Sequence, residues 1–141
     1  MPTLTEGSAE ALIIQYVADN LPSEVNLSDV KFPNAKGTKS PDSNFCNLEV
    51  QWAPSLPAMA GLKALYRTRG FLIVDVNVPK GSGDIDITSI IDKLIALFRN
   101  NVTFRQLGFV FEGSQIDPQD ERDKLDYYTK ILNIYFYIES Y

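Results

Sequence analysis

The sequence predicts an α+β fold, in which two helices pack on a mostly antiparallel four-stranded sheet in the order α-β-β-α-β-β. Several segments alternate apolar and polar residues at period two, which is typical of half-buried strands. Two others carry apolar residues at helical spacing. A turn rich in Pro and Gly at 79–83 joins the longest strand to the second helix. At 141 residues the chain fits one domain over 1–141, since domains typically run about 100–150 residues.

The first helix is expected at about residues 5–20. A capping-box pattern in Thr3-Leu4-Thr5-Glu6 begins it, with Thr3 or Thr5 as the cap, and Pro22 closes it. Residues 22–44 are rich in Pro, Gly, Ser and Asn, and they predict a long irregular loop or arm with at most a short extended piece near 30–32. A connection of this length is usually functional or mobile.

Residues 45–52 and 66–78 predict the first two strands, paired antiparallel as an extended hairpin with 55–61 in its loop. In the first strand the apolar residues alternate with polar ones, which places Cys46, Leu48, Val50 and Trp52 toward the core. In the second strand the core face is Leu72, Val74, Val76 and Val78. Pro79 ends this strand because proline has no N–H to donate.

The second helix is expected to follow at once, with an apolar stripe made of Ile87, Ile90, Ile91, Leu94, Ile95, Leu97 and Phe98. Asp84 and Asp86 are suited to start this helix, although two carboxylates at this spacing could instead bind a divalent cation. The preceding residues 80–83 (KGSG) only loosely resemble a phosphate loop, because the GxxxxGK[ST] order is absent.

Two further strands are expected after this helix. Residues 102–111 predict a short strand in which Phe109 and Phe111 share a face. Residues 117–124 predict a solvated turn. The acidic residues between 117 and 126 could suggest calcium binding, but they lack the spacing and the central Gly of a calcium-binding loop. Residues 127–138 predict the last strand, with Leu132, Ile134 and Phe136 facing the core.

The composition argues against catalysis and against DNA binding. The chain has no histidine and one cysteine, Cys46, which we interpret as a buried core thiol because no histidine could activate it. We therefore expect no catalytic residue, no cofactor and no metal. With 13 Lys and Arg against 18 Asp and Glu, the net charge is −5, so DNA should pass the surface without being gripped. The apolar runs are too short for a membrane span.

The second face of the sheet is unusual, because large apolar residues point toward it as well. Ile131, Tyr135 and Tyr137 alternate with the core residues of the last strand, and Phe71 and Ile73 do the same in the central strand. Either these are amphipathic side chains on an ordinary surface, or another chain covers them. We favour the second, because aromatic residues are enriched in interfaces.

Asp75 lies on the same face of the central strand. Its carboxylate could be solvent-exposed, or it could pair with a basic residue across a subunit boundary. The sequence leaves both interpretations open. The predicted subunit interface therefore consists of Phe71, Ile73, Asp75, Ile131, Tyr135 and Tyr137.

The central run YRTRGFLIVDVNVPKGSG, residues 66–83, resembles the tail terminator-like proteins of long-tailed bacteriophages, which carry a strand of the kind G-x-x-x-V-D-V-x-x-P-x-G-x-G before a helix. Residues 45–52, the acidic turn and the long last strand resemble the family more loosely. Residues 22–44 have no counterpart.

This resemblance implies a structural virion protein that forms a homohexameric ring at the head-proximal end of the tail tube. Such a ring ends polymerisation of the tube protein and presents the joining surface to head-completion or neck proteins, with DNA only as passing cargo. The subunits would assemble in the host cytoplasm. The alternatives are another neck or tail component, such as a head-closure or tube protein, and a small ligand-binding domain or enzyme.

Overall fold

The structure is a computed structural model and describes residues 5–25, 30–31, 44–54, 56–59, 65–79, 84–99, 102–118 and 127–140. The elements in chain order are α1 (Glu6–Asp19), β1 (Val30–Lys31), β2 (Phe45–Trp52), β3 (Leu56–Met59), β4 (Leu65–Pro79), α2 (Asp84–Phe98), α3 (Val102–Gln106), β5 (Val110–Pro118) and β6 (Tyr127–Ser140).

The described strands form one sheet in the order β1-β2-β4-β6-β5, and β3 pairs with the beginning of β4. β2, β4, β6 and β5 are antiparallel neighbours, which confirms the predicted α+β fold with a four-stranded antiparallel sheet. The short strands β1 and β3 and the short helix α3 are additions to the predicted order. The pairing aligns Leu48 with Val74 and Val74 with Leu132. Apolar side chains of three adjacent strands therefore share one face, as the alternation predicted.

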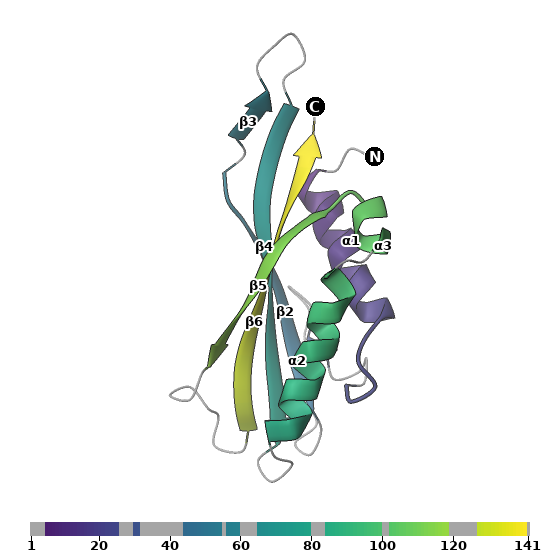
Figure 1. The fold of residues 1–141 in the computed structure, drawn as a ribbon, viewed down its shortest axis with the longest axis vertical. Helices are drawn as coiled ribbons and strands as arrows, with labels where there is room; N and C mark the ends of the chain where they lie inside the picture. The colour runs from purple at the N-terminus through teal and green to yellow at the C-terminus, as the bar shows by residue number, and fades with distance from the viewer. Residues whose placement is uncertain are drawn as a thin grey trace.

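The helices cover this face, and the opposite face of the sheet carries no helix among the described elements (Figure 1). α2 buries its apolar stripe against β4 and β6. At one end of the core, rings from five different segments gather in edge-to-face and stacked pairs: Tyr16, Phe98, Phe104, Phe109 and Phe136. Such pairs add to the stabilisation that burial alone provides.

α1 begins at a capping box and is tied to the sheet by a side-chain hydrogen bond. Thr5 is the cap, not Thr3: its Oγ1 accepts from the Ser8 backbone N at 3.2 Å, and Ser8 Oγ accepts from the Thr5 backbone N at 3.0 Å. Further along, Trp52 Nε1 of β2 donates to Glu10 Oε1 at 2.7 Å. The helix ends at Asp19, before Pro22, as expected.

The strand predicted at 102–111 is wrong in its first half, because Val102–Gln106 form α3. Phe104 of this short helix is fully buried, with its ring centroid 4.9 Å from that of Phe98 and 4.8 Å from that of Phe109. One helical turn brings Phe104 into the core, and this tertiary contact outweighs the local strand preference of the segment. Gly108, at a φ of 107°, then redirects the chain into β5, a backbone conformation that glycine adopts without strain.

The loops and short strands differ in smaller ways from the expected ones. The loop expected at 55–61 contains β3, which extends the hairpin with β4. The solvated turn was expected to begin at Asp117. This predicted start is wrong, because β5 runs through Pro118. The weak extended piece near 30–32 is confirmed as β1, which runs parallel to β2. Residues 80–83, 119–126 and most of 26–43 lie outside the described residues, as do the side chains of Asp84 and Asp86.

Candidate assembly surface

The six predicted interface residues lie together on the face of β4 and β6 that points away from the helices. We call this surface the open face. Across the two strands Phe71 is aligned with Tyr135 and Asp75 with Ile131, while Ile73 and Tyr137 occupy the neighbouring positions. All six are partly exposed, whereas the alternate residues of the same strands are buried in the core. The sequence pattern therefore correctly placed these six residues on one face, and their role as a subunit interface stays a prediction.

Contacts within the open face hold its rings in place. The rings of Phe71 and Tyr135 lie 5.8 Å apart between centroids, and the guanidinium carbon of Arg67 lies 4.2 Å from the centre of the Tyr137 ring. The Tyr135 hydroxyl donates to Gln115 Oε1 of β5 at 3.1 Å. A partner that covers these rings would meet side chains that are already ordered, so less conformational entropy would be lost on binding.

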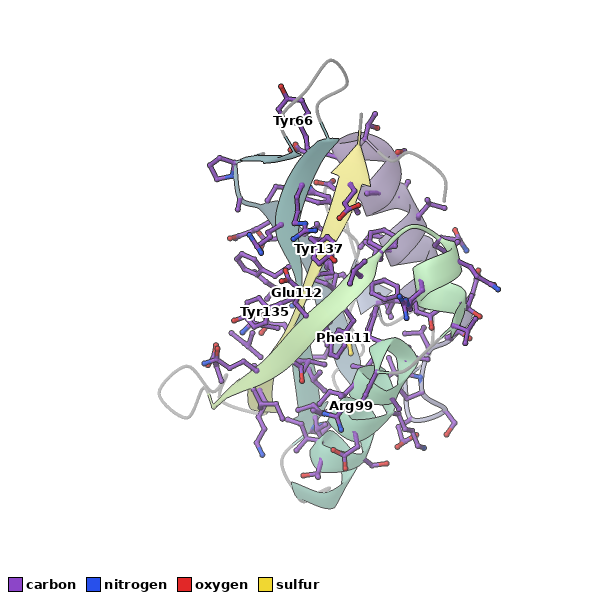
Figure 2. The ribbon with its side chains drawn as sticks, turned by 45° about the horizontal axis from the view of Figure 1, so that its top comes forward. Tyr66, Arg99, Phe111, Glu112, Tyr135 and Tyr137 are labelled. Atoms are coloured by element: carbon purple, nitrogen blue, oxygen red, sulfur yellow. The ribbon has the colours of Figure 1, made fainter. Side chains whose placement is uncertain are left out.

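Ion pairs border the rings, and sequence reasoning missed them. Arg67 Nη2 lies 2.8 Å from Glu139 Oε1, and Arg69 Nε lies 3.2 Å from Glu112 Oε1. The hydrogen bond from Arg67 to Glu139 raises the pKa of the arginine. Figure 2 shows Glu112 beside Tyr135 and Tyr137, with Phe111 on the helix side. The sequence did carry a signal for the arginines. Arg67 and Arg69 alternate with Phe71 at period two, which places all three on the same face of β4.

One end of this side of the sheet is already covered within the subunit. Phe45, Asn77 and Thr129 are aligned across β2, β4 and β6 and are only 3%, 0% and 8% exposed. Thr129 Oγ1 donates to Asn77 Oδ1 at 2.6 Å, and Asn77 Nδ2 reaches the Phe45 carbonyl at 3.4 Å. The exposed apolar area is therefore confined to the middle of the sheet and the end nearer to Tyr137.

The residues weighed for nucleophilic and metal chemistry do not form such a site where the structure describes them. Burial raises the pKa of the Cys46 thiol to about 12, with the charge of Asp75 adding to the shift, so the thiol stays protonated. Asp117 accepts from Asn133 Nδ2 at 2.9 Å. Over the described ranges no three His, Cys, Asp or Glu side chains come together as a metal site. The acids at 120–126 lie outside those ranges.

A pocket of about 290 Å³ lies between the C-terminal half of α1 and α3. We call it the α1–α3 pocket. Leu12, Tyr16 and Leu107 form its apolar floor, and Gln15, Asp19 and Asn20 form its polar rim. Figure 1 shows α1 and α3, whose residues line this pocket, on the side of the sheet away from the open face. None of the helices in the described part of the chain is long and apolar enough to cross a membrane.

Comparison with known proteins supports the fold. No protein-family description matches the sequence, and no curated protein matches it. Chains of solved structures do match. One of them, whose name states no activity, aligns over 94% of this chain and 96% of its own with a TM-score of 0.64 at 18% identity. At this identity the match shows a shared fold alone.

Proposed function

We propose that this protein is a structural subunit that assembles with copies of itself, and that the open face forms one side of the contact. The observation that carries the proposal is the group of partly exposed apolar and aromatic side chains at the middle of that face, namely Phe71, Ile73, Ile131, Tyr135 and Tyr137. Apolar surface gathered on one face of a soluble protein often marks an interaction site, and a second chain would remove the remaining exposed part of these side chains from water.

The electrostatics of the open face suit a protein partner better than a nucleic acid. Its two described arginines, Arg67 and Arg69, are matched by Glu139 and Glu112 on the same face. A neighbouring chain that buried this rim would therefore not leave either arginine unpaired. Asp75 adds a negative charge to the same face, which also disfavours a phosphate backbone as the partner. The net charge of −5 favours the same interpretation, because binding to phosphates requires uncompensated Lys and Arg.

In its specific form, the proposal is a homohexameric ring that caps a phage tail tube, as in the tail terminator-like proteins that the central run of residues 66–83 resembles. The ring would end polymerisation of the tube protein and present the joining surface to head-completion or neck proteins. DNA would pass through it, and the protein would belong to the virion without being an enzyme. Support for this form comes from the resemblance together with the apolar open face.

The experiment compares two matched double variants. Ile131→Ser with Tyr135→Lys changes the open face, whereas Ile116→Ser with Tyr66→Lys makes the same changes at exposed positions of β5 and β4 that lie outside it. We expect the first variant to sediment as a folded monomer and the second to assemble like the wild type. Hot-spot aromatic residues contribute about 2 kcal/mol or more each.

Circular dichroism of the same samples separates assembly from folding. An open-face variant that keeps both its native spectrum and its assembly would rule out the proposed contact. Loss of the native spectrum would show that Ile131 and Tyr135 stabilise the subunit itself, which would also contradict the proposal.

A further inference from the structure

The α1–α3 pocket combines an apolar floor with a negatively charged rim. Asp19 is exposed at the rim, and Gln15 Nε2 donates to its Oδ1 at 2.7 Å, which orients the carboxylate. Asp19 is also the last residue of α1, where the helix dipole concentrates negative charge. The last turn of α1 contains no basic residue that would offset this charge. The pocket is therefore suited to a side chain that has an apolar carbon chain and a positively charged end group.

Arginine provides this combination, because its methylene groups pack on apolar surfaces while the guanidinium pairs with a carboxylate. On the open face, Arg69 is the more exposed of the two described arginines, with 54% of its side-chain surface accessible against 35% for Arg67. Its pair with Glu112 uses Nε, so the end of the guanidinium extends beyond that pair.

We infer that the α1–α3 pocket receives Arg69 from the open face of the next copy of this chain. The inference rests on the proposed self-assembly and identifies the second half of its contact. A ring needs two different patches on each subunit, since a patch that meets itself gives only a closed dimer. The helices that line the pocket, α1 and α3, lie on the other side of the sheet from the open face (Figure 1), so one subunit can contact a neighbour on each side. Arg69 then pairs with Asp19 above Leu12 and Leu107.

A charge exchange tests this contact. Asp19→Arg should raise the protein concentration at which half of the assembly dissociates by about tenfold or more, because it places two cations together at the interface. The reciprocal change is Arg69→Asp, made together with Glu112→Gln so that the new carboxylate does not face Glu112. This variant should weaken assembly similarly, and clearly more than Glu112→Gln alone, which serves as its reference.

Combining the exchanged residues should return the half-dissociation concentration to within a fewfold of the Glu112→Gln value. Sedimentation velocity across a dilution series measures this quantity, and thermal melts show whether each variant is folded. If the wild type assembles and Asp19→Arg assembles equally well, the pocket is not part of the contact, although the open-face proposal stands. If both single exchanges weaken assembly and their combination does not restore it, Arg69 is not the partner of Asp19. A wild type that never assembles overturns the proposed function and this inference with it.

Discussion

Gly70 lies where β4 passes directly beside the indole ring of Trp52. A Cβ atom at this position would come within 2.8 Å of the Trp52 ring and 3.1 Å of the Gln51 carbonyl oxygen. The ring has little room to move, because it contacts Phe136 edge to face and donates to Glu10. Because Gly70 has no Cβ atom, β2, β4 and α1 can pack closely together at this point.

We expect Gly70→Ala to lower the free energy of unfolding by about 1–3 kcal/mol, because overpacking forces neighbouring side chains from their preferred positions. Denaturant unfolding followed by Trp52 fluorescence measures this change. Gly7→Ala is the matched control, since a Cβ atom there meets no atom within 4 Å. Equal stability of the Gly70 variant and the wild type would show that this close contact does not constrain the fold.

Glu24 joins the segment after α1 to α2. Its carboxylate accepts from Lys93 Nζ at 2.6 Å and from Ser89 Oγ at 2.6 Å. The hydrogen bond from Lys93 is the largest cause that lowers the pKa of Glu24 to about 2, followed by that from Ser89. A lowered pKa means that the folded state favours the charged form, so the stabilisation is present at neutral pH and is lost as the pH falls from about 4.5 toward 2.

Glu24→Gln should therefore be less stable than the wild type at pH 7, by about 0.5–1 kcal/mol because Lys93 is half exposed and solvent screens the pair. The difference should shrink below pH 4.5, where the wild-type carboxylate begins to lose its advantage. Urea unfolding of both proteins between pH 2 and pH 7 measures it. A difference that stays constant over this range would mean that the charge of Glu24 contributes nothing.

Among the secondary-structure elements, β4 shows most clearly which face of the sheet is buried under the helices. Val74 is 1% exposed beneath the helices, whereas its neighbour Ile73 lies on the open face. Val74→Asp should cost several kcal/mol, out of a total stability of about 5–15 kcal/mol, because it buries a carboxylate in the core.

Ile73→Asp makes a similar change one residue earlier and should leave the isolated subunit folded. Thermal unfolding at concentrations below assembly compares the two variants. The opposite order of stabilities would show that the two faces of β4 have been assigned the wrong way round.

The elements that could be predicted from the sequence are those with long uninterrupted patterns. β2, β4, α2 and β6 each repeat their period over eight residues or more, so burial and pattern agree. α3 and β3 are only five and four residues long, and tertiary contacts determine them. In α3 the contact is the burial of Phe104, which no local periodicity indicates.

The candidate surface was predictable to a similar degree. The alternation of β4 and β6 was enough to place Phe71, Tyr135 and Tyr137 on one face. The ion pair of Arg69 with Glu112 was not predictable, because it depends on how β5 aligns with β6. That alignment shifts at the irregularity between Phe111 and Gly113, where Gly113 has a φ of 144°. The α1–α3 pocket likewise depends on α3, which the sequence did not reveal.

At the scale of the assembled protein, the two sides of the subunit have different surfaces. The open face offers rings that are ordered before binding, and the helical layer on the other side offers a pocket with a negative rim. Each subunit would use both, so a weakness in one contact would be repeated at every boundary of the proposed ring. This explains why substitutions at two positions should be enough to prevent assembly.

The most direct test is the mass of the wild-type protein in solution, measured by sedimentation or light scattering and accompanied by electron micrographs of the same sample. We predict a discrete species of six 15.8 kDa chains that appears as closed rings. A protein that remains a monomer at all accessible concentrations, with no rings on the grid, would contradict the claim that the open face serves self-assembly.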